Sequence, residues 1–284
     1  MEHSIEAILC YMREYPEESI EKIAERFGYS KFHFSREFKR LTGFSAKQFG
    51  YSKFHFSREF KRLTGFSAKQ FVSALKMEKS IENLVKKKRS VLSAHLQAGF
   101  LSASTFSSSF EKQTGMTPKQ YQKQLEKLHR VLVEYESNRS IIRSHYEASD
   151  DRTSCSRCIV NLHFPKDYTR GITFVGLFRH PIPNHRPIIG KAVVGNTVCI
   201  LDRIPKGQYY LLSCAIEKGS SLAKYFVMKD CLRARVDEAL IFPKEDGNIY
   251  DLYFRGPLPQ DPPITINLPK LLADGLYPLF RQKE

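Results

Sequence analysis

The sequence lacks the features that mark membrane, exported and disulfide-rich proteins. None of its apolar runs approaches the ~18–20 residues that a membrane-spanning helix needs. Met1–Ser4 show no basic segment followed by an apolar one, so we expect no secretory signal. Six cysteines among 284 residues are too few for a disulfide scaffold. We therefore expect reduced thiols and a cytoplasmic protein.

The sequence is also poor in motifs for catalysis and cofactor binding. It contains no P-loop and no G-x-G-x-x-G, and its histidines and acidic residues show no nucleophile–base spacing. Cys155 and Cys158 form a single C-x-x-C near His145 and His163, and this ligand set is incomplete for zinc. We interpret the two cysteines as free thiols in a linker. The sequence thus predicts a protein that is not an enzyme and binds no metal or cofactor.

Acidic residues are scarce relative to basic ones. The chain has 45 Lys and Arg against 30 Asp and Glu, for a net charge of +15 and a pI near 9.5. The segment 28–89 alone holds 16 basic and 4 acidic side chains. A basic run is either a solvated helix face or a surface that binds phosphates, and the excess charge favours an anionic partner.

An error-free repeat lies in this basic segment. Residues 28–49 read GYSKFHFSREFKRLTGFSAKQF, and residues 50–71 read the same 22 letters. An old repeat would have drifted at surface positions, so we interpret the second copy as a recent insertion or an error in assembling the sequence. The repeat does not favour a solenoid, because a solenoid needs at least ~3 units.

A fainter repeat lies further along the chain. Ser30 to Phe49 align without gaps on Ser102 to Tyr121, with eight identities in 20 positions. In each unit, helical apolar spacing, a Ser N-cap and a Gly-containing turn predict a helix-turn-helix. A basic helix over 67–88, about 33 Å long, would join the two units.

The second half of the chain has a different sequence pattern. Short β-rich runs separated by Pro/Gly turns predict an all-β sandwich, with a transthyretin-like shape as the nearest type. The expected strands are 172–178, 192–201, 208–216, 249–255 and 264–268. We therefore predict a multidomain protein: an all-α double helix-turn-helix domain over 1–130, a linker over 131–158, and a β-sandwich over 159–284 for effector binding or oligomerisation. We also expect residues 159–284 to fold alone.

The third predicted helix has an outward face suited to DNA. Arg can bond bidentately to guanine, Ser can bond to several bases and Phe can touch a thymine methyl, while Lys and Arg at the margins hold phosphates. A basic surface helix without a ligand is the competing interpretation. The candidate DNA-binding residues of both copies and of the second unit are Lys31, Phe32, Ser35, Arg36, Lys39, Arg40, Lys53, Phe54, Ser57, Arg58, Lys61, Arg62, Ser104, Thr105 and Ser108.

Residues 3–129 resemble the DNA-binding domain of AraC/XylS-family transcriptional regulators. The resemblance is carried by IAERFGYSKFHFSREFKRLTGFSAKQF and GFLSASTFSSSFEKQTGMTPKQY, above all by their closing T-G-[FM]-[ST]-x-K-Q-[FY]. It implies that Phe32, Ser35 and Arg36, or their copies, contact bases. Two departures weaken base reading by the second unit: His95 stands where the family packs a small Ala, and Ser108 where an Arg is common.

These features predict a sequence-specific transcription regulator. Its expected partner is operator or promoter DNA, and we keep open a small-molecule effector and a homo-oligomer. The alternative is a small-molecule or carbohydrate-binding β-sandwich protein whose DNA-binding half is degenerate. We expect the first copy of the repeat to fold with its neighbours and the second to form a helix beside the connecting helix.

Overall fold

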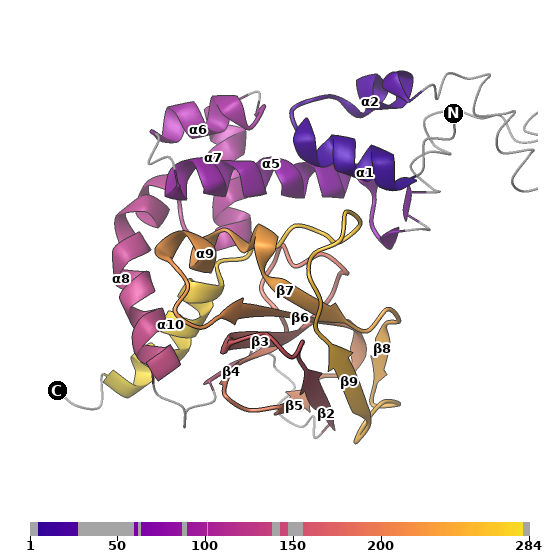
Figure 1. Ribbon diagram of the computed structural model, residues 1–284, viewed down its shortest axis with the longest axis vertical. Coiled ribbons are helices and arrows are strands. Elements are labelled where there is room, and N and C mark those ends of the chain that lie inside the picture. Colours follow the sequence, from indigo (N-terminus) through magenta and orange to yellow (C-terminus); the bar gives the residue numbers. More distant parts are fainter. Residues whose placement is uncertain are drawn as a thin grey trace, which may run out of the picture.

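The computed structural model describes residues 5–27, 60, 61, 64–86, 90–100, 102–137, 143–146 and 156–280. The helices of the N-terminal half gather around one long helix, α5 (Ala68–Val85), which lies across the top of the β-rich half in Figure 1. At one end lie α1 (Ile5–Glu14) and α2 (Ile20–Arg26). At the other lie α6 (Val91–Gln97) and α7 (Ala103–Thr114). From there α8 (Pro118–Ser137) runs down beside the sheets.

The C-terminal half contains two sheets. The six-stranded sheet has the order β1-β4-β3-β6-β7, and β8 also pairs with β6. The three-stranded sheet has the order β5-β2-β9, with β2 and β9 parallel. The strand bounds in chain order are β1 Arg143–Tyr146, β2 Ser156–His163, β3 Arg170–Phe178, β4 Ile189–Val194, β5 Val198–Ile204, β6 Gly207–Glu217, β7 Leu232–Arg235, β8 Leu240–Phe242 and β9 Ile249–Tyr253.

Each face of the six-stranded sheet packs against a different layer. One face shares a hydrophobic cluster with the three-stranded sheet, including Val175 and Leu211 on one side and Val160 and Leu252 on the other. The opposite face is covered by helices α8, α9 (Leu222–Phe226) and α10 (Leu268–Phe280). We call the cluster on this second face the central core, and it continues into α5 and α7 of the N-terminal half.

The structure corrects several predictions for the second half. This half is not all-β, because it also contains α9, the short 3₁₀ helix η2 (Met228–Asp230) and α10. The run 192–201 is two strands in different sheets, since Gly195 (φ 74°) turns the chain between them. Residues 264–267 belong to no strand, and the chain enters α10 at Leu268. The predicted linker is partly regular structure, because it holds the end of α8, strand β1 and the start of β2.

Candidate nucleic-acid interface

The connecting helix α5 begins at a capping box. Ser67 Oγ accepts a hydrogen bond from the Gln70 backbone N–H at 3.2 Å, and Gln70 Oε1 accepts one from the Ser67 N–H at 2.9 Å. The apolar face of the helix, including Phe71, Leu75 and Met77, is buried. The described helix has 18 residues, so it is about 27 Å long. It is thus shorter than the predicted helix over 67–88.

The same turn stands before α5 and before α8. In each, a buried threonine hydroxyl lies within 3.0 Å of two backbone oxygens: Thr64 with those of Phe60 and Phe66, Thr114 with those of Phe110 and Met116. The glycine that follows is left-handed, with φ 83° at Gly65 and 71° at Gly115. The T-G motif repeated in the sequence therefore builds the same structure twice.

The second copy of the exact repeat contributes to the core at α1 and α2. We call this cluster the first-unit core; its members are Ile8, Leu9, Met12, Ile23, Phe60, Phe66, Ala68, Phe71, Val72, Leu75 and Ile182. Phe60, Phe66 and Phe71 belong to the second copy and are each about 1% exposed or less. The second copy thus packs with α1 and α2, the elements with which the first copy was expected to fold. The first copy lies outside the described residues.

Most predicted DNA contacts of the first unit also lie outside the described residues. These are Lys31, Phe32, Ser35, Arg36, Lys39, Arg40, Lys53, Phe54, Ser57, Arg58 and Arg62. Lys61 is described and exposed. It directly follows buried Phe60, so this short stretch turns one side chain to the core and the next to solvent.

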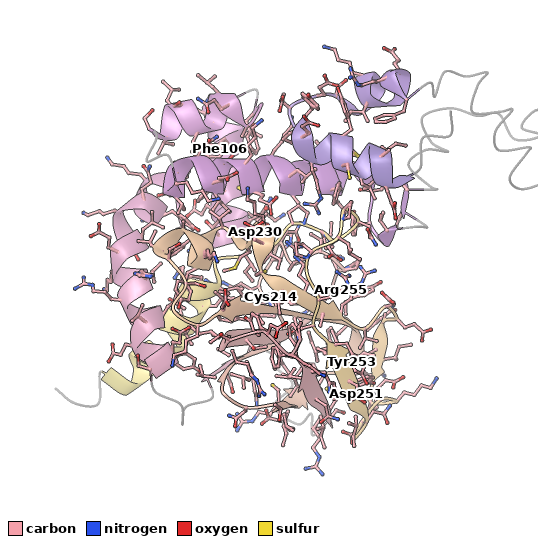
Figure 2. The ribbon with its side chains drawn as sticks, viewed as in Figure 1. Phe106, Cys214, Asp230, Asp251, Tyr253 and Arg255 are labelled. Carbon is pink, nitrogen blue, oxygen red and sulfur yellow. The ribbon has the colours of Figure 1, made fainter. Side chains whose placement is uncertain are left out.

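Helix α7 presents the predicted contact residues of the second unit. Ser104, Thr105 and Ser108 are exposed, whereas Phe106 and Phe110 on the opposite side are fully buried. Figure 2 labels Phe106 beneath α6. Ser102 caps the helix by accepting from the Thr105 N–H at 3.2 Å, and its hydroxyl donates to Thr105 Oγ1 at 2.8 Å. The Thr105 hydroxyl is therefore partly engaged in the cap.

The buried side of helix α6 is made of small residues and His95. Ala94, His95 and Ala98 are buried, while Leu92 and Leu96 are 62% and 61% exposed. The His95 ring lies 5.9 Å from the Phe106 ring, and its Nδ1 lies 3.2 Å from the Leu92 carbonyl oxygen. The His95 side chain, larger than the Ala that the family packs here, is thus accommodated inside the unit.

Two lysines of α5 fasten the two helix-turn-helix units to one another. Lys76 Nζ donates to the Gly99 carbonyl at 2.9 Å, in the turn between α6 and α7. Lys79 Nζ lies 2.9 Å from Glu17 Oε2, in the turn between α1 and α2. Gly99 has φ 72°, and a Cβ there would come 2.9 Å from the Glu17 Cβ. The two turns therefore meet over α5, at a point where only glycine fits.

The N-terminal half is joined to the β-rich half at α1. Arg13 donates from Nε to the Pro259 carbonyl at 3.0 Å and from Nη2 to the Asp261 carbonyl. The connection between β3 and β4 inserts Ile182 into the first-unit core. Asp261 is itself held by Arg255, with contacts of 2.7 and 2.9 Å. Burial would raise the pKa of Asp261, and the hydrogen bonds from Arg255 and the Leu258 N–H outweigh it and lower that pKa.

A pair of titratable side chains lies away from these helices. His163 Nε2 and Asp251 Oδ1 are 2.7 Å apart on the exposed face of the three-stranded sheet, and the Tyr253 ring stacks on His163. Figure 2 places Asp251 and Tyr253 at the far end of the molecule from α1. Sequence spacing missed this pair because 88 residues separate its members.

The predicted linker thiols are only partly described. Cys155 lies outside the described residues, whereas Cys158 is buried in the cluster between the sheets, which raises the pKa of its thiol to about 12. Within the described ranges, no group of three His, Cys, Asp or Glu side chains could hold a metal ion. No helix in that part of the chain is long and apolar enough to cross a membrane.

Two family models match the N-terminal half. Residues 16–49 match the model of bacterial regulatory helix-turn-helix proteins of the AraC family, and residues 45–124 match a helix-turn-helix domain model. The first match ends with the first copy of the repeat, and the second contains the whole second copy. No curated protein matches the chain. The matches support a DNA-binding transcription regulator of the AraC type and do not favour a sandwich protein with a degenerate DNA-binding half.

Proposed function

We propose that the protein regulates transcription by binding a specific double-stranded operator or promoter sequence through two helix-turn-helix units. The observation that carries this proposal is the agreement between the AraC-type match and the duplicated turn, with Thr64-Gly65 and Thr114-Gly115 in the same geometry. In such units the second helix enters the major groove.

The two units would contribute unequally to recognition. The first unit carries the basic outward stripe of Phe32, Ser35 and Arg36, duplicated at Phe54, Ser57 and Arg58, and would supply most base contacts. In the second unit, exposed Ser104 and Ser108 lie on the same helix as exposed Glu111. We infer that this unit positions the protein on the duplex more than it reads bases.

The β-rich half would then be the effector or oligomerisation domain, over about residues 159–284. Two sheets that share one hydrophobic cluster support the transthyretin-like sandwich type for it. A ligand or a second copy bound there would act on DNA binding through the contacts at α1 and Ile182.

Selection from a random duplex library with the purified full chain tests the proposal. We expect an enriched sequence whose affinity falls steeply with salt, with a log–log slope of about −0.9 for each neutralised phosphate. Ser108→Glu on α7 should weaken binding at least about tenfold, because it adds a negative charge beside phosphates. The matched control Thr197→Glu, in the exposed turn between β4 and β5, should leave affinity unchanged. Binding that does not depend on salt, or the absence of an enriched sequence, would contradict the proposal.

A further inference from the structure

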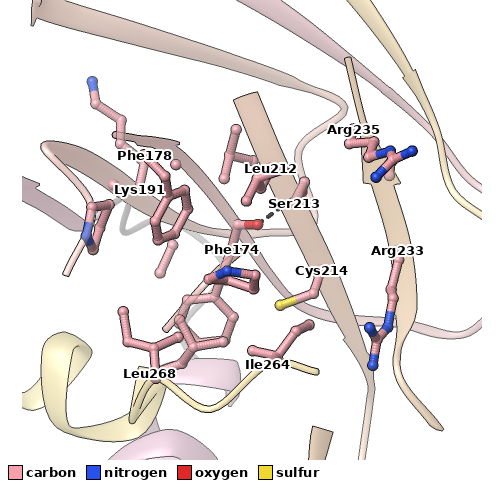
Figure 3. Close-up of a pocket in the computed structure, with 18 of the residues that line it drawn as sticks. Phe174, Phe178, Lys191, Leu212, Ser213, Cys214, Arg233, Arg235, Ile264 and Leu268 are labelled. Atoms are coloured by element: carbon pink, nitrogen blue, oxygen red, sulfur yellow. Dashed lines mark hydrogen bonds between the residues drawn. The ribbon is translucent and has the colours of Figure 1, made fainter. Parts of the chain in front are cut away.

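A pocket opens on the helix-covered face of the six-stranded sheet. It lies between the sheet and the chain leading into α10 and is partly open to solvent. Figure 3 shows apolar side chains around it, among them Phe174, Phe178, Leu212, Ile264 and Leu268. Leu272 also lines the pocket. Sites for small molecules have such a predominantly apolar lining with a few polar groups.

One charged side chain of the lining, that of Arg233, is buried and forms no direct ion pair with a described carboxylate. Arg233 is 6% exposed and pairs in register with Cys214, so both side chains lie on the pocket face of the sheet. Its two terminal nitrogens donate to the carbonyls of Pro262 and Met228, and its Nε has no hydrogen-bond partner. None of the ion pairs between described residues includes Arg233.

The charges of two carboxylates act on Arg233, and neither carboxylate forms an ion pair with it. Burial raises the pKa of Glu78 on α5, which favours its neutral form, and the charge of Arg233 opposes this rise. Asp261 also lines the pocket but is bound by Arg255 at both oxygens. Arg235, the other cation of β7, is paired only with Asp237, whose side chain is 82% exposed. Arginine stays ionised in proteins, and a buried charge without a counter-ion is costly. The wall around Arg233 is therefore complementary to an anion that enters from outside.

The walls of the pocket also belong to the contacts with the DNA-binding half. Pro183 and Pro187 line the pocket, and Ile182 beside them is buried in the first-unit core. Asp261 and Pro262 line it as well, and the Asp261 carbonyl accepts from Arg13 of α1. A ligand that moves either wall must therefore change the packing of α1.

We propose that this pocket binds a small amphipathic anion, with its apolar body against Phe174 and Leu268 and its acidic group on Arg233, and that binding changes the packing of α1. The coupling to α1 concerns the proposed function, because α1 belongs to the first helix-turn-helix unit. The binding itself is independent of DNA.

Titration calorimetry of the full chain with 2-naphthoate, and with neutral 2-naphthylmethanol as the matched ligand, tests the site. We expect naphthoate to bind at least about tenfold more tightly than the alcohol, because only the carboxylate pairs with Arg233. Arg233→Met should remove that preference, while Arg157→Gln, which removes an exposed positive charge on β2, should keep it. Leu212→Trp leaves Arg233 in place and fills the pocket, so it should abolish binding of both ligands. Equal affinities for the two ligands, or a preference that survives Arg233→Met, would overturn the assignment.

Hydrogen exchange of the same samples, without DNA, tests the coupling. We expect naphthoate to change the exchange of α1 amides at least about twofold in the native chain and to change nothing in Leu212→Trp. Naphthoate binding without any change at α1 would overturn the coupling. A chain that binds naphthoate but no duplex DNA would contradict the proposed function while leaving the anion site standing.

Discussion

At the scale of residues, the least expected group is the carboxyl of Glu78 at the junction of the two halves. Its Oε1 is out of contact with solvent and has no hydrogen-bond partner. Burial raises the pKa of Glu78, and the negative charge of Glu82 adds to this rise. The positive charges of Arg233, Arg13 and Lys229 oppose the rise. The raised pKa means that the folded state holds this proton more tightly than the unfolded state.

The sign of the pH dependence follows from that difference. Between the unfolded pKa and the raised folded pKa, the folded chain binds more protons, so the contribution of Glu78 to stability falls as the pH rises. We expect Glu78→Gln to be more stable than the native chain at neutral pH and equal to it below about pH 4, where both states are protonated. Urea unfolding of both chains from about pH 3 to about pH 8 measures this; a difference that is the same at every pH would contradict it.

At the scale of elements, the repeat raises the question of which copy builds the first unit. Phe60, Phe66 and Phe71 of the second copy fill the first-unit core. Between Phe27, which ends the α2 segment, and Phe60 the chain has 32 residues. Without one copy, the residue equivalent to Phe60 would follow Phe27 after only ten residues. Because the copies are identical, removing 28–49 or 50–71 yields the same 262-residue chain.

We expect this 262-residue chain to be more stable and to bind DNA more tightly. Shortening the connection lowers its closure entropy by about 1 kcal/mol, which raises the melting temperature by about 2–4 °C. The positioning helix α2 then directly precedes the recognition helix. Thermal unfolding and binding to the selected duplex measure both effects. Equal or weaker DNA binding would instead show that the additional copy is functional.

At the scale of the whole molecule, the two halves share one continuous core. Leu128, Leu132 and Tyr135 of α8 belong to the same cluster as Ile172 and Phe174 of β3. Tyr135 also donates its hydroxyl to the Ala192 carbonyl of β4 at 2.7 Å. Glu136 at the end of α8 is buried and accepts from the Tyr225 hydroxyl at 3.0 Å and the Gly219 N–H at 3.1 Å. Helix α8 is therefore part of the β-rich half in packing terms.

This packing revises the expectation that residues 159–284 fold alone. That fragment lacks α8, strand β1 and the first residues of β2, so it would leave an apolar sheet face in water. We expect it to aggregate or to unfold without cooperativity, whereas residues 118–284, which keep α8, should show a cooperative thermal transition. Circular dichroism and light scattering of the two fragments compare them. A cooperative transition at the same temperature in both would show that α8 is dispensable.

The sequence by itself determined the local architecture of the N-terminal half. The caps at Ser67 and Ser102, the Thr-Gly turns and the apolar spacing of α5 and α7 depend on residues a few positions apart, so their chemistry can be read along the chain. It also predicted β3 and β6, whose apolar runs are long. Only the tertiary structure showed that Phe60, Phe66 and Phe71 enter the first-unit core, that α8 and α10 cover the sheet, and that Asp261 accepts from Arg13 near Arg233. These contacts join residues far apart in the chain, and their energies come from burial and pairing that no local pattern encodes.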